Sequence, residues 1–367
     1  MSGSSPSRRE TQFARAVLTR NLQVRPGENV IIEGWTHTLP WAVALARETR
    51  RLKAHPLVLF EDEDAFWDSV EHHEDAILGA APAHEWAALG KTNVYIHMWG
   101  AGDRMRMASL PGGRGEKLIA FNNAWYKAAA KSGLRGSRLE IGRPFPNLAR
   151  MYRVDESSWR NQLIDATLVD PERLRAVGKP IERALERGRR LRIQDDHGTD
   201  LTLGLAHRRA FGAYGRITKE EIHLPFRMLN LLPAGAIRVA LDESVADGTF
   251  VANRTCYFDL GTATGGTFEF RNGRLVRHHF DSGGNFFDAG FKTGGKGRDR
   301  PGLLSIGLNP KLHNTPQVED LEAGAIMVSV GMNRFNPGGK NMSSFFGFAV
   351  NAGARVEVDG HPLKIPS

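Results

Sequence analysis

A histidine-rich segment in the C-terminal half carries the residue types of a metal site. His278, His279 and Asp281 lie close together, and imidazole and carboxylate groups are common ligands of divalent metals. In a β-strand, however, successive side chains point to opposite faces of the sheet. Because the two histidines would then point away from each other, we do not expect them to share one metal ion.

Two serines and a histidine supply the groups of a nucleophilic site. Ser343 and Ser344 carry hydroxyl groups, and His313 could act as their base. The sequence has no Gly-x-Ser-x-Gly turn of the kind that presents a nucleophilic serine, and spacing alone does not place the histidine beside either hydroxyl. Capping of loops is therefore the simpler expectation for both serines.

Neutral hydrogen-bonding side chains gather between residues 309 and 344. A few polar groups that converge on an apolar pocket are what a small-molecule or peptide site requires. Asparagine also favours turns, because it tolerates the left-handed backbone conformation, and this explains part of the pattern without a ligand. The candidate ligand-binding residues in this region are Asn309, His313, Asn333, Arg334, Asn341, Ser343 and Ser344.

Composition excludes several classes of function. The 367 residues include 49 Lys and Arg against 41 Asp and Glu, but no basic run is interleaved with aromatic residues, so we do not expect nucleic-acid binding. No apolar stretch is long enough to span a membrane, and the first residues lack the apolar segment of a secretory signal. Cys256 is the only cysteine, which excludes an intrachain disulfide and a thiolate-rich metal site. The cytoplasm is the expected compartment.

The N-terminal half alternates between helical and strand patterns. Apolar spacing and short apolar runs predict helices over 11–22, 40–51 and 180–187 and strands over 29–33, 56–60, 93–97 and 117–121. Such alternation is typical of a parallel sheet covered by helices on both faces. No Gly-x-Gly-x-x-Gly follows the first strand, so no dinucleotide site is indicated.

From about residue 191 the pattern changes to short β-rich runs separated by Gly and Asn. Asn272-Gly273 and Asp359-Gly360 are pairs typical of tight hairpin turns. All seven tryptophans lie in the first 160 residues, which also distinguishes the two halves. We therefore predict an α/β protein with a disordered lead over 1–10, an N-terminal parallel-sheet α/β domain over 11–190, and a mixed, mostly antiparallel α/β domain over 191–367.

Four segments of the C-terminal half resemble, in order, the signature segments of a known family. They are Leu-Pro-Ala-Gly-Ala-Ile (232–237), Leu-Leu-Ser-Ile-Gly-Leu-Asn-Pro (303–310), Gly-Ala-Ile-Met-Val-Ser-Val-Gly (324–331) and Gly-Gly-Lys-Asn-Met-Ser-Ser-Phe-Phe-Gly-Phe (338–348). Together with residues 23–33, 197–202 and 270–276, they are similar to the thermophilic metallo-aminopeptidases of the aminopeptidase T type. The resemblance covers most of the chain and implies an aminopeptidase T-like fold and a homodimer.

The resemblance also implies where metal ligands should stand, and this chain has apolar residues there. The family's peptidases hold two divalent metals with carboxylates and imidazoles, and the metals generate hydroxide from water. None of the five side chains here is such a ligand, so we expect no metal cofactor and no aminopeptidase activity. Iron-dependent dihydroxypyridine dioxygenases, which share the fold, are disfavoured for the same reason. The ligand positions are Ala236, Leu303, Met327, Phe346 and Phe348.

Two interpretations of the apolar replacements stay open: a decayed site filled as core, or a dry, aromatic-lined binding site. Our primary hypothesis is a metal-free, aminopeptidase T-like protein that binds a short peptide or an amide-bearing small molecule in the former active-site cleft, at Phe346 and Phe348. It would assist the maturation of a peptide natural product without hydrolysis. The alternatives are an enzyme with metal-independent cyclisation or isomerisation chemistry, and a metallohydrolase with relocated ligands.

Overall fold

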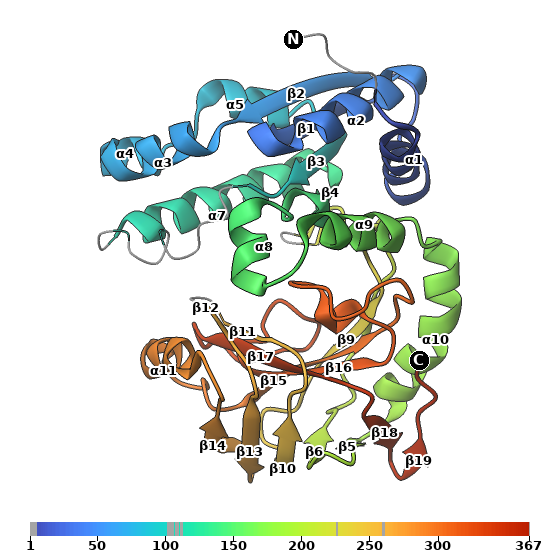
Figure 1. Cartoon of the computed structure of the whole chain (residues 1–367), viewed down its shortest axis with the longest axis vertical. Coiled ribbons are helices and arrows are strands. Elements are labelled where there is room, and N and C mark those ends of the chain that lie inside the picture. Colours follow the sequence, from blue (N-terminus) through green and yellow to red (C-terminus); the bar gives the residue numbers. More distant parts are fainter. Residues whose placement is uncertain are drawn as a thin grey trace. The chain divides into compact units, whose positions relative to one another are not determined.

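The computed structural model describes residues 6–100, 106, 110, 113–224, 227–258 and 261–366, and Figure 1 shows their course. The chain folds into two compact units. Unit one is formed by residues 1–171 and 215–233, and unit two by residues 172–214 and 234–367. The chain therefore enters unit two, returns to unit one over 215–233, and then completes unit two.

The ends of several helices follow from local sequence. The helix α1 (Arg8–Ala16) begins at a capping box, in which the Glu10 N–H donates to Ser7 Oγ at 3.2 Å and the Ser7 N–H donates to the Glu10 carboxylate at 2.6 Å. It starts inside the expected lead over 1–10, of which residues 1–5 lie outside the described residues. The helix α10 (Pro171–Arg187) ends before Gly188, as predicted. No helix in the described part of the chain combines the length and the apolar character that crossing a bilayer requires.

Unit one is built around a parallel sheet. Within the described residues the strand order is β2-β1-β3-β4-β8, and every neighbouring pair is parallel. This confirms the parallel-sheet α/β architecture, which the alternation of helical and strand patterns in the N-terminal half predicts. The strands are β1 (Asn29–Trp35), β2 (His55–Glu61), β3 (Val94–Met98), β4 (Arg135–Leu139) and β8 (Leu229–Leu232). The helices that accompany α1 are α2 (Leu39–Arg51), α3 (Glu63–His72), α4 (Asp75–Leu78), α5 (Ala83–Leu89), α7 (Arg114–Ser132), α8 (Pro146–Tyr152) and α9 (Glu156–Thr167).

One predicted strand is wrong. Residues 117–121 lie in the helix α7, and the strand that follows β3 is β4. A short apolar run does not distinguish a buried strand from a helix. After Asn122 and Asn123 this run is followed by Ala-Trp-Tyr-Lys-Ala-Ala-Ala (124–130), which favours a helix. The sequence of β4, Arg-Gly-Ser-Arg-Leu, is polar, so only its position between β3 and β8 makes it a strand of the sheet.

Unit two contains two antiparallel sheets in its described residues. The β6 sheet has the order β14-β13-β10-β6-β5-β18-β19, and the β16 sheet has the order β12-β11-β17-β16-β15-β9-β7. The strands of the β6 sheet are β5 (Arg190–Gln194), β6 (Asp200–Gly204), β10 (Ala246–Val251), β13 (Thr267–Arg271), β14 (Arg274–His279), β18 (Arg355–Val358) and β19 (His361–Pro362). Those of the β16 sheet are β7 (Phe211–Ala213), β9 (Ala236–Ala240), β11 (Cys256–Phe258), β12 (Gly261–Ala263), β15 (Pro301–Gly307), β16 (Ala325–Gly331) and β17 (Phe346–Ala352). The helix α11 (Gly284–Thr293) lies between β14 and β15 in the chain.

Both hairpin turns predicted from the sequence are confirmed. Asn272 and Gly273 connect β13 to β14 with φ values of 50° and 70°, and Asp359 and Gly360 connect β18 to β19 with φ values of 49° and 80°. Positive φ at both central residues is the geometry of a type I′ turn, which Asn-Gly and Asp-Gly favour.

The two faces of the β16 sheet differ in what they contact. On β17, the Asn351 amide donates to the Val251 carbonyl at 2.7 Å and to Thr199 Oγ1 at 3.2 Å, so this face of the sheet packs toward the β6 sheet. Side-chain alternation places Phe346 and Phe348 on the opposite face.

Candidate functional site

The positions that the resemblance assigns to metal ligands converge on that opposite face of the β16 sheet, which we name the apolar face. Leu303 of β15 pairs with Ala240 of β9, and Met327 of β16 pairs with Val350 of β17. Because side chains alternate along each strand, this register brings all five positions to one face. They are Ala236, Leu303, Met327, Phe346 and Phe348.

Burial differs along the apolar face. Leu303 and Met327 are 7% and 3% exposed and belong to a buried apolar cluster. Phe346 and Phe348 pack against this cluster but remain partly exposed, with ring centroids 5.8 Å apart. The inner part of the face is therefore core, whereas its margin presents two aromatic rings.

The apolar face does not fit a divalent metal. Its ligand positions offer alkyl and phenyl groups and one thioether, which hard divalent ions do not bind. The polar side chains Ser305 and Arg238 on the same face both contact Asp320, at 3.3 Å and 2.8 Å. Within the described ranges, no group of three or more His, Cys, Asp or Glu is arranged to hold a metal ion. The residues present therefore do not match the paired-metal chemistry of the family's peptidases.

Four of the seven predicted polar site residues are buried, and two of these, Asn309 and Asn333, brace loops. The Asn309 amide donates to the Ala234 carbonyl at 2.7 Å and accepts from the Lys311 N–H at 3.0 Å. The Asn333 amide donates to the Glu243 carboxylate at 2.8 Å. Both asparagines use these groups to hold backbone or a neighbouring carboxylate inside the protein.

Three further predicted residues line a cavity in unit two. This cavity, of about 670 Å³, is lined by Asn341, Ser343 and Ser344 among others. The Asn341 amide donates to the Gly297 carbonyl at 2.8 Å, and Ser343 Oγ donates to the Gly294 carbonyl at 2.7 Å. The exposed Ser344 donates its backbone N–H to the same Gly294 carbonyl at 3.2 Å. Hydrogen bonding of Ser343 to the loop is the capping role expected for it.

The remaining predicted polar residues are exposed. His313 lies in the loop after β15, where its N–H donates to Thr315 Oγ1 at 3.3 Å. The Arg334 guanidinium lies 4.9 Å from the ring centroid of Phe335. The structure therefore does not bring the nine predicted residues together: the two phenylalanines lie on the apolar face, and the polar residues lie in loops.

The histidine pair of β14 points to opposite faces, as alternation predicts. His278 Nε2 lies 2.8 Å from the Asp288 carboxylate, and its ring packs on Phe287 with centroids 4.4 Å apart. The side chain of His279 is exposed. Cys256 is buried, and burial raises the pKa of its thiol to about 12, so it is a packed residue rather than a nucleophile.

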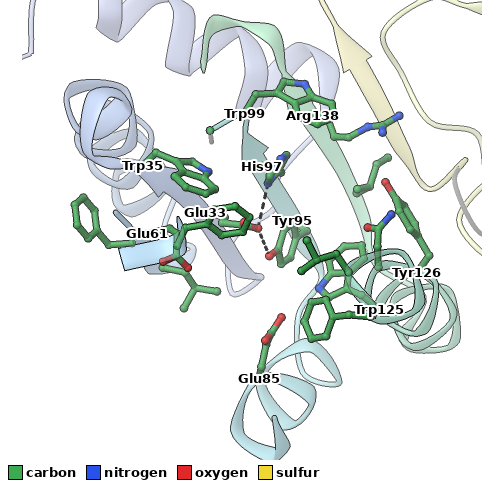
Figure 2. Close-up of a pocket in the computed structure, with 18 of the residues that line it drawn as sticks. Glu33, Trp35, Glu61, Glu85, Tyr95, His97, Trp99, Trp125, Tyr126 and Arg138 are labelled. Carbon is green, nitrogen blue, oxygen red and sulfur yellow. Dashed lines mark hydrogen bonds and ion pairs between the residues drawn. The ribbon is translucent and has the colours of Figure 1, made fainter. Parts of the chain in front are cut away.

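Unit one contains a cavity of about 570 Å³ at the carboxyl ends of its parallel strands (Figure 2). The sheet register places Glu33 of β1 beside His97 of β3, and His97 beside Arg138 of β4. Two residues beyond Glu33, toward the carboxyl end of β1, Trp35 pairs with Glu61 of β2. The carboxyl ends of parallel strands meet at one edge of a sheet, which is where α/β proteins place their ligands.

Much of the wall of this cavity is aromatic. Tyr95 of β3 and Trp125 of α7 pack edge to face with ring centroids 4.8 Å apart, and Trp35 packs in the same way on Phe66 of α3 at 5.5 Å. Aromatic walls with a few polar groups are typical of small-molecule sites.

Glu33 joins two neighbouring strands inside the cavity. Tyr95 Oη donates a hydrogen bond to the Glu33 carboxylate, and His97 Nδ1 lies 3.2 Å from the same oxygen, as Figure 2 shows. Burial alone would raise the pKa of Glu33, but His97 and Tyr95 hold this pKa below the usual value. Burial, and then the charge of Glu33, raise the pKa of Tyr95 well above its usual value. The cavity thus holds a fixed carboxylate beside a neutral phenol and an imidazole.

Two further carboxyl groups face the cavity. Burial and repulsion from Glu33 raise the pKa of Glu61, and burial with repulsion from both of these residues raises the pKa of Glu85 on α5. Across the cavity, the Arg138 guanidinium lies 5.7 Å from the ring centroid of Trp99. The cavity therefore has an acidic side and a basic side.

None of these cavity residues is identified as a site residue from the sequence, although the sequence contains a signal that points to two of them. The predicted strands over 29–33 and 93–97 each end in a titratable residue, Glu33 and His97. A predicted parallel sheet brings such ends to one edge. The missing glycine-rich loop excludes a dinucleotide but leaves other ligands open.

Solved structures share this fold. The chain is similar to wild-type AmpT from Thermus thermophilus, with 17% identity, a TM-score of 0.72 and coverage of 98% of both chains. It is also similar to the 2,5-dihydroxypyridine dioxygenase of Pseudomonas putida KT2440, with 14% identity, a TM-score of 0.61 and coverage of 97% of this chain and 95% of that one. These similarities confirm the predicted α/β, aminopeptidase T-like fold. No curated protein sequence matches the chain.

A family model matches the sequence itself. Residues 7–299 match the model of the thermophilic metalloproteases, family M29. The matched range includes Ala236 and ends before Leu303, Met327, Phe346 and Phe348. Because it spans well over half of the 367 residues, the chain belongs to the thermophilic metalloprotease (M29) family.

Proposed function

We propose that this chain is a metal-free, non-hydrolytic member of the M29 family that binds a short peptide or an amide-bearing small molecule over the apolar face. The observation that carries this proposal is the partial exposure of Phe346 and Phe348 beside the buried Leu303 and Met327. Two rings tilted by 52° offer π-faces on which an amide plane or an apolar side chain can pack.

The chemistry of the apolar face supports binding without hydrolysis. Cleavage of a peptide by this family needs metal-bound hydroxide and a polarised carbonyl, and alkyl, phenyl and thioether groups supply neither. The family match ends at residue 299, before four of the five ligand positions, and by the resemblance this sequence carries apolar residues at these positions. The role that we propose is therefore to hold or shield a peptide during its maturation into a natural product. By resemblance to the family we also propose a homodimer, and from the single cysteine we propose a cytoplasmic location.

Binding of a blocked peptide tests the proposal. Isothermal titration with N-acetyl-Leu-Leu-amide should give saturable binding that a chelator does not change. Phe346→Ala and Phe348→Ala should each weaken the affinity about tenfold, the loss expected for one well-packed aromatic contact. Val276→Ala removes an exposed apolar side chain of the same unit, on β14, and should leave the affinity unchanged. Equal affinity in all three variants would contradict the proposal.

A further inference from the structure

Partly buried charged side chains in the described part of unit one normally have a partner of opposite charge. Arg135 bonds the Glu28 carboxylate at 2.8 Å, and Arg227 bonds Glu221 at 3.3 Å. Such pairing is expected because a charged group that leaves water loses hydration that only another polar group can replace.

The cavity of unit one departs from this rule. Glu61, Glu85 and Arg138 all line it and are all half-buried, yet none of them has an ion-pair partner among the residues described. The Nε atom of Arg138 is buried without a hydrogen-bond partner in the same set. By contrast, the neighbouring Arg143 is neutralised by Glu140. Within the described residues, these three charges therefore lack a partner of opposite charge, which a ligand would supply.

The unpaired charges stand on two sides of the cavity. Glu61 ends β2 and Glu85 projects from α5, whereas Arg138 lies on β4, two strands beyond β1 in the sheet order (Figure 2). A ligand that satisfies both sides must carry a positive group at one end and a negative group at the other. The carboxylates do not form a metal site, since no cluster of His, Cys, Asp and Glu in the described ranges could hold a metal ion.

The walls of the cavity favour an organic cation. Trp35 and Trp125 line it, and aromatic faces attract ammonium groups as well as apolar side chains. Trp35 is only 6% exposed, and its Nε1 has no hydrogen-bond acceptor among the described residues, so a ligand oxygen would satisfy it. The volume of about 570 Å³ lies within the usual range of small-ligand sites.

We propose that this cavity binds a small zwitterion whose ammonium and carboxylate groups stand at opposite ends, an ω-amino acid or a molecule of that class. Its ammonium group lies between Glu61 and Glu85, its carboxylate meets the Arg138 guanidinium, and the chain between them packs on the aromatic wall. This site lies wholly within unit one and is independent of the proposed function of the apolar face.

Four six-carbon ligands of nearly equal length test the charge requirement on the unmodified protein. 6-aminohexanoate carries both charges, one at each end, hexylamine only the positive one, hexanoate only the negative one, and 1-hexanol neither. Isothermal titration should show the tightest binding for 6-aminohexanoate. Each charge that is removed should weaken binding about tenfold, the change expected for one partly desolvated ion pair.

Neutralising substitutions assign each charge to its partner. Glu61→Gln and Glu85→Gln should weaken the binding of 6-aminohexanoate and hexylamine about tenfold and leave the binding of hexanoate unaffected. Arg138→Gln should weaken the binding of 6-aminohexanoate and hexanoate and leave the binding of hexylamine unaffected. Glu74→Gln and Arg47→Gln are matched controls, because both side chains are exposed and lie outside the cavity in the same unit.

Binding of 6-aminohexanoate with the predicted order of ligands supports the proposal, even if a variant fails to fold, because the order is measured on the unmodified chain. Equal affinity for all four ligands, or no binding of 6-aminohexanoate at millimolar concentration, overturns it. Unchanged affinity in folded Glu61→Gln, Glu85→Gln and Arg138→Gln variants also overturns it.

Discussion

Phe346 and Phe348 present their rings on one face of β17, with centroids 5.8 Å apart, although every residue of the neighbouring strand β16 is buried. In a strand, residues two apart share a face, so both rings lie on the face to which the resemblance assigns the family's metal ligands. The partial exposure of these rings is the observation on which our proposal of a ligand-binding surface rests.

Stability measurements separate these two readings of the rings. Phe346→Ala and Phe348→Ala should lower the free energy of unfolding by about 1–2 kcal/mol, well below the roughly 3–5 kcal/mol typical of a fully buried phenylalanine. Phe345→Ala is the matched control, because Phe345 is 2% exposed and packs on Phe287 and Phe291. It should show the full loss in chemical denaturation. Losses of equal size at all three positions would mean that the rings are core.

Aminopeptidase activity should be absent. Purified protein should not release amine from leucine amides above background, with or without added zinc, cobalt or manganese, because the apolar face has no group that activates water. Release that saturates with substrate and persists through repeated purification would show that a hydrolytic centre exists elsewhere in the chain.

The loop after β16 depends on one buried asparagine. Besides Glu243, the Asn333 side chain contacts the Asn341 N–H at 2.8 Å. Asn333→Ala leaves these buried groups without a partner and should cost about 2–4 kcal/mol of unfolding free energy. Asn336→Ala, in the same loop but with no side-chain hydrogen bond in the described residues, should cost less than about 0.5 kcal/mol. Similar melting temperatures for both variants would refute this role.

The acid stability of unit two should depend on Glu243. Burial alone would raise the pKa of this carboxyl group, but hydrogen bonds from Arg208 and Asn333 lower it to about 2. A carboxylate with a depressed folded-state pKa stabilises the fold above its unfolded pKa, and this contribution is lost as the pH falls toward the folded pKa. The unmodified protein should therefore exceed Glu243→Gln in unfolding free energy by on the order of 2 kcal/mol at neutral pH.

The pH dependence of this difference is the test. Denaturant titrations of both proteins should converge between about pH 4.5 and pH 2, as the carboxyl group of the unmodified protein takes up its proton. A difference that stays constant across this range would mean that Glu243 acts through its shape and not through its charge.

Much of the fold could be predicted from local patterns, because hairpin pairs and amphipathic spacing act within a few residues. Asn272-Gly273 fixes a type I′ turn by its own backbone preference. The strand over 117–121 was a wrong prediction because an apolar run of this length fits both a strand and the helix α7. β4 escapes prediction for the opposite reason, since its polar sequence becomes a strand through pairing with distant neighbours.

The candidate sites divide in the same way. The resemblance identifies Leu303, Met327 and Phe346 by sequence position, and the sheet register then places them on one face. The cavity of unit one depends on residues far apart in the chain, such as Glu33 and Arg138, which line the same cavity only because of the order of the parallel strands. Nothing in the local sequence of either residue indicates that the other lines this cavity.

The central claim is that the metal-binding face of this family has become an apolar surface that holds no metal. The most direct test is elemental analysis of protein purified without exposure to a chelator. We predict well under one equivalent of zinc, iron, cobalt or manganese per chain, because no carboxylate or imidazole stands at the five ligand positions. One or more equivalents per chain, retained after dialysis, would contradict the claim.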